Sequence, residues 1–219
     1  MTKLIIFDLD GTLLDTLQDL ADCTNFILRK YGFPEHPLDS YKYFVGNGIP
    51  VLIHKAVPEG TSKEVEESVL ADFLPYYDLH KADLTAPYQG IVDLLEQLHQ
   101  QQILIAVASN KIHDAMAPLM KYYFPSIPFL ATLGNRVGVP PKPNPAIVEE
   151  IIGLSGFNKD EILYVGDTKV DMDTAQNAGL RAVGVLWGFR DREELEGASA
   201  EYIIQNPGEL LDLLTRNSY

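Results

Sequence analysis

Short, continuous runs of apolar residues recur along this 219-residue chain and restrict its fold more than any other feature. A run without polar alternation is typical of a strand buried on both faces, as in a parallel sheet covered by helices. Apolar residues at helical spacing precede the second and third runs. This alternation predicts an α/β fold with a doubly wound, Rossmann-like parallel sheet. The runs occupy residues 4–7, 103–108, 162–165 and 182–186, with a weaker one at 202–204.

The interval between the first two runs is much longer than one crossover helix requires. Apolar stripes at helical spacing occupy residues 17–31, 51–57 and 65–74 of this interval. We expect the first of these helices to stop at Gly32 and the third to end near Pro75.

The sequence therefore predicts two domains. A small all-helical cap occupies residues 15–82, inserted after the first strand. The α/β core comprises residues 1–14 and 83–219. Because two connections tie the cap to the core, we expect it to hinge.

Charge and composition exclude several classes of protein. Seventeen basic residues against 31 acidic residues give a net charge of −14, which argues against nucleic acid or an acidic membrane as a partner. The single cysteine, Cys23, can form no internal disulfide, which favours a reducing compartment. No apolar run approaches the ~20 residues of a membrane helix, and the N-terminus is not a signal peptide. We expect a cytoplasmic monomer or homodimer.

Two carboxylates, Asp8 and Asp10, directly follow the first run. This is the carboxyl end of the expected strand, and ligands bind at the carboxyl ends of the strands in an open parallel sheet. Residues two apart share a face of a strand, and Gly11 then allows a tight turn close to a ligand. One carboxylate can act as a nucleophile that forms an acyl phosphate, and the other as a general acid and then base. Alone, such a pair is more often a solvated turn with Asp capping a helix.

A second acidic pair, Asp167 and Asp171, follows the third run. Together with Asp8 it crowds negative charge at one sheet edge, which calls for a cation. Mg²⁺ prefers oxygen ligands, whereas the chain has no cluster of Cys and His for zinc. Alone, Asp171 is as readily explained by the dipole of a helix that Thr168 caps.

Two further signals are polar groups suited to phosphate. Ser109 and Asn110 follow the second run, and we expect them to open a helix whose N-terminus binds an anion. Lys142 lies among four prolines that stiffen the chain and can aim its charge at a phosphate. Asn144 is expected to cap the next helix, with Pro145 at its first position. Alone, a simple N-cap and a solvated loop are the commoner explanations.

These motifs, in this order, resemble the four motifs of the haloacid dehalogenase superfamily. They are Asp-Leu-Asp-Gly-Thr at residues 8–12, Ser109, Lys142, and Gly-Asp-Thr-Lys-Val-Asp at residues 166–171. Residues 15–20 and 44–48 are also similar to segments of the phosphoglycolate phosphatases, which carry a helical cap after the first motif. This second similarity is less specific than the four motifs.

The resemblance implies a Mg²⁺-dependent phosphate monoester hydrolase. Asp8 would accept the phosphoryl group, and Asp10 would protonate the leaving alcohol and then activate water. Asp167 would bind Mg²⁺ together with the Asp8 carboxylate and the Asp10 main-chain oxygen. Asp171 would orient Lys142 or a water on the metal. The implied metal site therefore comprises Asp8, Asp10, Asp167 and Asp171.

The resemblance also implies how phosphate and leaving group are bound. Ser109 would bind a phosphoryl oxygen and Lys142 would neutralise the phosphate. The implied phosphate-binding set is completed by Gly11, Thr12 and Asn110. Within the cap, we expect Lys42 and Asn47 to contact the leaving group. The resemblance to the subgroup implies 2-phosphoglycolate, a small phosphorylated metabolite, as the substrate.

Other functions remain open from the sequence. Sugar-phosphate phosphatases or mutases and pyrophosphatases of the same superfamily share the core and differ in the cap. Dehalogenases are disfavoured because they lack an acid equivalent to Asp10. A phospho-accepting receiver domain has similar strand-end groups, but the long helical insert and Asp10 argue against it. A silent binding protein is disfavoured because every required group is present.

Overall fold

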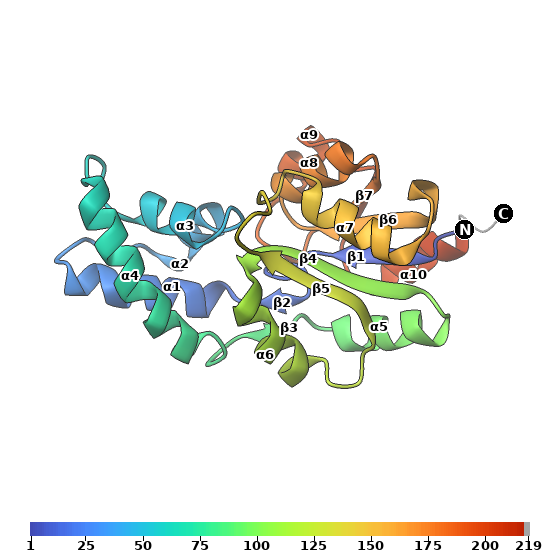
Figure 1. The fold of residues 1–219 in the computed structure, drawn as a ribbon, viewed down its shortest axis with the longest axis horizontal. Coiled ribbons are helices and arrows are strands. Elements are labelled where there is room, and N and C mark those ends of the chain that lie inside the picture. The colour runs from blue at the N-terminus through green and yellow to red at the C-terminus, as the bar shows by residue number, and fades with distance from the viewer. Residues whose placement is uncertain (217–219) are drawn as a thin grey trace.

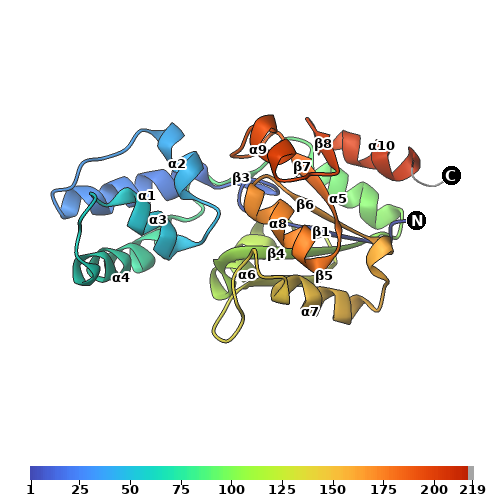
Figure 2. The ribbon, with the colours of Figure 1, turned by 90° about the horizontal axis from the view of Figure 1, so that it is seen from above.

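One parallel sheet of six strands organises residues 1–216, the part of the chain that this computed structural model describes (Figures 1 and 2). Its strand order is β5-β4-β1-β6-β7-β8, so β1 lies inside the sheet between β4 and β6. The predicted doubly wound parallel sheet is confirmed. The strands are β1 Leu4–Phe7, β4 Leu104–Ile112, β5 Phe129–Asn135, β6 Ile162–Gly166, β7 Arg181–Val185 and β8 Tyr202–Ile204.

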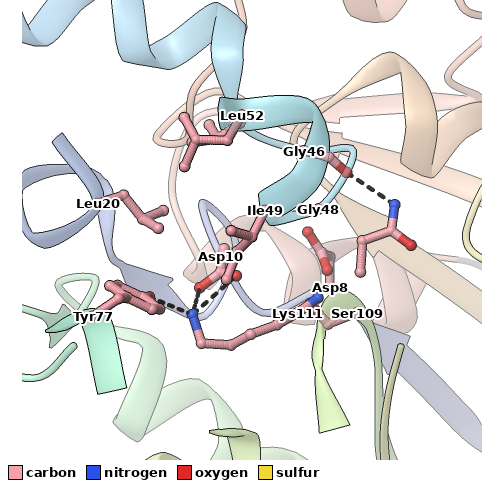
Figure 3. Close-up of a pocket in the computed structure, with 12 residues that line it drawn as sticks. Asp8, Asp10, Leu20, Gly46, Gly48, Ile49, Leu52, Tyr77, Ser109 and Lys111 are labelled. Atoms are coloured by element: carbon pink, nitrogen blue, oxygen red, sulfur yellow. Dashed lines mark hydrogen bonds and ion pairs between the residues drawn. The ribbon is translucent and has the colours of Figure 1, made fainter. Parts of the chain in front are cut away.

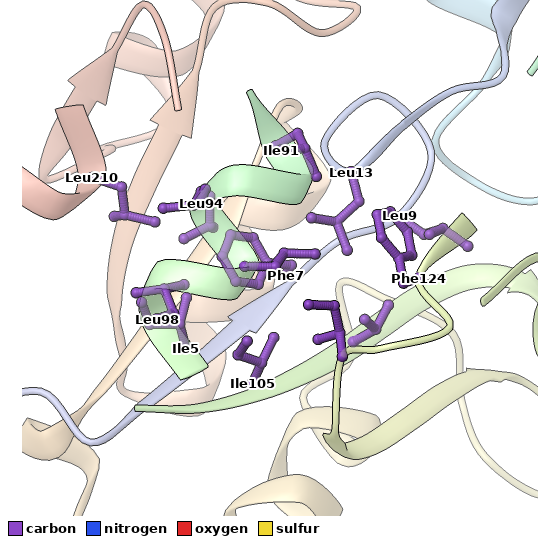
Figure 4. Close-up of a cluster of buried hydrophobic side chains, with 14 of the residues drawn as sticks. Ile5, Phe7, Leu9, Leu13, Ile91, Leu94, Leu98, Ile105, Phe124 and Leu210 are labelled. Carbon is purple, nitrogen blue, oxygen red and sulfur yellow. The ribbon is translucent and has the colours of Figure 1, made fainter. Parts of the chain in front are cut away.

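Helices cover both faces of the sheet, which explains the unbroken apolar run of β1. Ile5 and Phe7 pack into one hydrophobic cluster (Figure 4), whereas Leu4 and Ile6 pack into another on the opposite face. All four side chains are fully buried. The first face carries α5 Ile91–Gln100, α6 His113–Tyr123 and α10 Gly208–Arg216; the second carries α7 Ala146–Ser155, α8 Lys169–Ala178 and α9 Arg192–Gly197. A short 3₁₀ helix, Lys159–Glu161, precedes β6.

Four of the five helices between β1 and β4 lie beyond one end of the sheet (Figures 1 and 2), and we call them the helical insert. They are α1 Leu17–Lys30, α2 Leu38–Phe44, α3 Ile49–Ala56 and α4 Lys63–His80. They enclose a separate hydrophobic cluster, to which Phe189 of the core also belongs. At its base, β2 Leu14–Asp15 pairs antiparallel with β3 Ala86–Pro87. Buried Asp19 accepts hydrogen bonds from the main-chain N–H groups of Leu84 and Thr85, at 2.9 and 2.8 Å.

Strand β5 is absent from the sequence expectations. It is an edge strand that pairs only with β4. Six of its seven residues are half-buried, so its sequence carries no continuous run of strongly apolar residues. The signal that identifies the central strands is therefore missing here.

Two expected boundaries are wrong. Helix α4 does not end near Pro75 but continues to His80. Proline removes one helical hydrogen bond, and the following turn is held by buried Tyr77 and by stacking of Tyr76 on Phe26, with ring centroids 4.1 Å apart.

None of the helices within residues 1–216 has the length and hydrophobicity needed to span a bilayer.

The second wrong boundary concerns Ser109 and Asn110, which do not open a helix. Strand β4 continues through Ile112, and α6 begins at His113. The strand pairs with β5 as far as Ile112, which lies opposite Asn135, and this pairing is irregular between Ala108 and Ile112.

Candidate active site

Asp8 and Asp10 follow β1 at the sheet edge that faces the helical insert (Figure 3). The main-chain N–H of Asp8 donates to Val165 O at 2.9 Å, so the sheet pairing extends to the first carboxylate. Gly11 then turns the chain with φ +92°, in the left-handed region that favours glycine. A Cβ at Gly11 would collide with the Asp167 carboxylate, so glycine is needed for this close approach.

Lys142 is buried against the nucleophile candidate, with its side chain 2% exposed. Its Nζ donates to Asp8 Oδ1 at 2.8 Å and to Asp171 Oδ1 at 2.8 Å. It also donates to Ala108 O and to the Tyr164 hydroxyl, both at 2.9 Å. Burial lowers the pKa of Lys142, but Asp171 and Asp8 outweigh it, so the pKa lies well above its usual value. Lys142 is therefore a fixed cation.

Asp171 is held by the start of its own helix. Its Oδ2 accepts from Thr168 Oγ1 at 2.8 Å and from the Thr168 main-chain N–H at 3.1 Å, which is the cap expected at this position. Its Oδ1 accepts from Lys142 and, at 3.2 Å, from Tyr164. A Cβ at Gly166 would collide with Asp171, so glycine lets β6 pack against this carboxylate.

Three buried carboxylates, from Asp8, Asp167 and Asp171, each place an oxygen within 4.8 Å of the others. Burial raises the pKa of Asp8 to about 7 despite the attraction of Lys142. Burial, and then Asp171 and Asp8, raise the pKa of Asp167 well above its usual value. Lys142 alone does not balance the charge of three carboxylates. Their oxygen atoms form a donor set that suits a hard divalent cation.

Asp167 is oriented by two segments that are distant in sequence. Thr12 Oγ1 donates to its Oδ1 at 3.1 Å, and the Phe189 main-chain N–H donates to its Oδ2 at 2.8 Å. Trp187 Nε1 in turn donates to Thr12 O at 2.9 Å. Thr12 is fully buried and directs its hydroxyl at Asp167. Sequence reasoning missed residues 187–189, because this loop carries none of the expected charged groups.

The polar residues of β4 link the core to the helical insert. Asn110 Nδ2 donates to Gly46 O at 3.0 Å and to Lys142 O at 3.1 Å, while its Oδ1 accepts from the Lys142 main-chain N–H at 2.9 Å. The Asn110 side chain therefore positions the Lys142 segment. Ser109 Oγ accepts from the Lys111 main-chain N–H at 3.1 Å, and Ser109 lines the cavity above Asp8.

Sequence reasoning also missed Lys111 and Tyr77. Lys111 Nζ donates to Asp10 Oδ1 at 3.0 Å and to the Tyr77 hydroxyl at 2.7 Å (Figure 3). Burial lowers the pKa of Lys111, but Asp10 and Tyr77 outweigh it, so the net pKa is raised. Lys111 could have been found, because it directly follows two motif residues. Tyr77 could not, because its helix was expected to end before it.

A small cavity, about 40 Å³, lies between Asp8 and the helical insert. The acids and Lys111 form its floor, and Leu20, Ile49 and Leu52 form apolar walls (Figure 3). Lys42 and Asn47, the expected specificity residues, are not among the residues that line it. Lys42 instead pairs with Asp39 on α2 at 3.0 Å. The glycines on either side of Asn47 do line the cavity.

The chain is similar to known proteins along most of its length. A model of the Haloacid dehalogenase-like hydrolase family matches residues 5–185. The phosphoglycolate phosphatase of Mannheimia succiniciproducens is 31% identical over 219 residues, which cover 97% of this chain and 98% of that protein. The phosphoglycolate phosphatase of Pseudomonas putida is 30% identical, with coverage of 96% and 79%.

A solved structure has the same fold. It is described as "a predicted phosphoglycolate phosphatase" from Haemophilus somnus 129pt, with a TM-score of 0.90 and 27% identity. The match covers 97% of this chain and 98% of that one. The similarity therefore includes the helical insert as well as the sheet.

Proposed function

The chain belongs to the haloacid dehalogenase-like hydrolases and is a phosphoric monoester hydrolase, and we propose that it cleaves 2-phosphoglycolate through an aspartyl phosphate on Asp8. One observation carries the mechanism: Asp8 and Asp10 line the same cavity, yet each is paired with a different buried lysine. Two carboxylates in different surroundings can take different roles.

In the first step, an Asp8 carboxylate oxygen attacks phosphorus and the bond to the ester oxygen breaks. The departing oxygen takes a proton from Asp10, which acts as the general acid. The products of this step are the alcohol and an acyl phosphate on Asp8.

In the second step, Asp10 removes a proton from water, whose oxygen attacks phosphorus. The acyl phosphate bond breaks, inorganic phosphate leaves, and the Asp8 carboxylate is restored. Asp10 ends the cycle protonated, ready for the next leaving group. Lys111, which touches both Asp10 oxygens, holds this carboxyl group over the reacting centre.

Lys142 offsets the repulsion between an anionic nucleophile and a phosphate dianion. Asp171 and the Ala108 carbonyl fix its ammonium group beside Asp8, so its charge needs no rearrangement when substrate arrives. Ser109, which lines the cavity, is placed to donate to a phosphoryl oxygen.

We propose Mg²⁺ as the cofactor, held by Asp8 and Asp167 with the main-chain oxygen of Asp10, and with Asp171 beside them. The buried carboxylates fit this ion because one lysine does not balance their charge. When bound, Mg²⁺ supplies the positive charge that screens nucleophile and phosphate.

The helical insert would then serve as a cap, with residues 15–82 forming one domain and residues 1–14 and 83–219 the other. The cavity between them is completed by residues from both. Closure over a substrate would exclude water from the reacting centre. The apolar walls favour a short leaving group over a sugar, whose hydroxyls would lack hydrogen-bond partners there.

The test is phosphate release from a panel of esters with Mg²⁺ and with a chelator. We expect the highest kcat/KM for 2-phosphoglycolate, lower values for sugar phosphates, nucleotides and pyrophosphate, and no turnover after chelation. A higher kcat/KM for a sugar phosphate would overturn the proposed substrate. Full activity in excess chelator would remove the metal.

A further inference from the structure

The Lys111 ammonium group is buried at the floor of the cavity, with its side chain 2% exposed. It bonds Asp10 on the core and the Tyr77 hydroxyl on α4, and it lies 5.1 Å from the centre of the Tyr77 ring. The Ser109 hydroxyl accepts from the Lys111 main-chain N–H, which fixes where the side chain begins. Lys111 is therefore held in place by three neighbours.

A lysine ammonium carries three N–H donors. The three acceptors of Lys111 Nζ are the Tyr77 hydroxyl at 2.7 Å, Asp10 Oδ1 at 3.0 Å and Asp10 Oδ2 at 3.3 Å, so the contact to Oδ2 is the longest. Within residues 1–216, these are the acceptors that Lys111 Nζ contacts. Asp10 keeps its shorter contact when a ligand in the cavity that Lys111 lines takes over the N–H that points at Oδ2.

Apart from Lys111, the described residues that line the cavity supply no positive charge to balance an anion. Among the described residues, Lys111 is the one cationic side chain in the lining. The other charged groups there, Asp8 and Asp10, are both acids, and the walls are apolar. A negative charge buried in such a place without a cation would be strongly disfavoured.

We propose that Lys111 determines specificity by binding a carboxylate on the leaving group. The substrate class is then short phosphate esters whose alcohol carries a carboxylate close to the ester oxygen. In 2-phosphoglycolate one CH₂ group separates the two. One ammonium group can therefore hold Asp10 at the ester oxygen and bind the carboxylate at once. This inference rests on the proposed function and assigns a residue to its selectivity.

The test compares 2-phosphoglycolate with 2-hydroxyethyl phosphate, in which a neutral CH₂OH replaces the carboxylate. In Lys111→Met, both esters should lose activity because Asp10 is less well held. The acidic ester should lose about 10- to 100-fold more, the range for a lost hydrogen bond to a charged group. Lys121→Met, at an exposed lysine on α6, should leave the ratio of the two kcat/KM values unchanged.

Binding provides a readout without turnover. With Mg²⁺ present, the native protein should bind 3-phosphonopropionate about 10- to 100-fold more tightly than propylphosphonate, and Lys111→Met should bind both alike. Thermal unfolding would check that this variant is folded. Equal binding by the native protein, or a preference that survives in Lys111→Met, would overturn the inference.

The two failures are distinguishable. If the native protein prefers 2-phosphoglycolate and Lys111→Met keeps the same preference, Lys111 does not bind the carboxylate and the proposed function stands. If the native protein hydrolyses other esters and not 2-phosphoglycolate, the proposed substrate is wrong, whatever Lys111 binds.

Discussion

Two buried lysines, Lys142 and Lys111, lie beside Asp8 and Asp10, and their surroundings differ. Lys142 contacts four acceptors, all from the α/β core. Lys111 contacts both Asp10 oxygens and a tyrosine of the helical insert, and it lines the cavity, whereas Lys142 does not. Both side chains are 2% exposed, so burial does not account for the difference.

The contrast separates two tasks. Every phosphate monoester presents the same phosphoryl group, so the hydrogen bonds that position Lys142 can all form before a substrate arrives. Leaving groups vary, so the Lys111 side is completed by the substrate and by the insert. Substitutions on the first side should affect all substrates alike, and those on the second should distinguish between them.

The largest effect should come from Asp8, the proposed nucleophile, which Lys142 contacts. Asp8→Asn keeps the shape of the side chain and removes the charged oxygen, so kcat should fall about 10⁴-fold or more for every ester. Steady-state phosphate release measures this, with Asp173→Asn on α8 as the control. A variant with near-native turnover would exclude the aspartyl phosphate.

Removing the Lys142 charge should have the next largest effect. Lys142→Ala leaves the repulsion between Asp8 and phosphate unscreened on one side, so kcat/KM should fall about 10²- to 10³-fold. Lys169→Ala, at an exposed lysine of α8, should change little. A loss of only a few-fold in Lys142→Ala would mean that this lysine does not act on the phosphoryl group.

The crowding of carboxylates around Lys142 should be visible in stability. Without metal, Asp167→Asn removes a buried carboxylate and, with it, the repulsion from Asp171 and Asp8, and should raise Tm by about 3 °C. Mg²⁺ should raise Tm of the native protein and not of this variant. Thermal unfolding with and without Mg²⁺ tests both, and Asp212→Asn on α10 serves as the control. A lower Tm for metal-free Asp167→Asn would contradict the excess of charge.

The smallest effect should come from Tyr77, whose hydroxyl accepts a hydrogen bond from Lys111. Tyr77→Phe removes one acceptor of the ammonium group and keeps the ring, so kcat/KM should fall about three-fold. Tyr76→Phe is the matched control, because Tyr76 lines a different hollow, beside Cys23 and Phe26. An effect as large as that of Lys142→Ala would give Tyr77 a part in the chemistry itself.

The surroundings of Lys142 and Lys111 also differ in how much of them could be predicted from the sequence. The grouping of Asp8, Asp167 and Asp171 was predictable because they follow apolar strands of one parallel sheet, which places them at a common edge. The contacts of Lys111 join segments that are distant in sequence. Lys111 meets Tyr77 only because α4 continues past Pro75. Tyr164 reads as an apolar residue of β6, although its hydroxyl contacts Lys142 and Asp171.

The strands of the sheet also differ in how readily the sequence identifies them. Central strands such as β1 are buried on both faces, so their sequences are continuously apolar and easily recognised. The edge strand β5 is half-buried and lacks this pattern. The end of β4 depends on an irregular pairing with β5, so the structural setting of Ser109 and Asn110 could not be predicted.

The most direct test of the division between the two lysines is one ratio, measured in four proteins. It is kcat/KM for 2-phosphoglycolate divided by kcat/KM for 2-hydroxyethyl phosphate, in the native protein, Lys142→Ala, Lys111→Met and the double variant. We expect Lys142→Ala to lower both values and leave the ratio at its native level. Lys111→Met should lower the ratio about 10- to 100-fold, with no further change in the double variant. A ratio that falls as far in Lys142→Ala as in Lys111→Met would contradict the division.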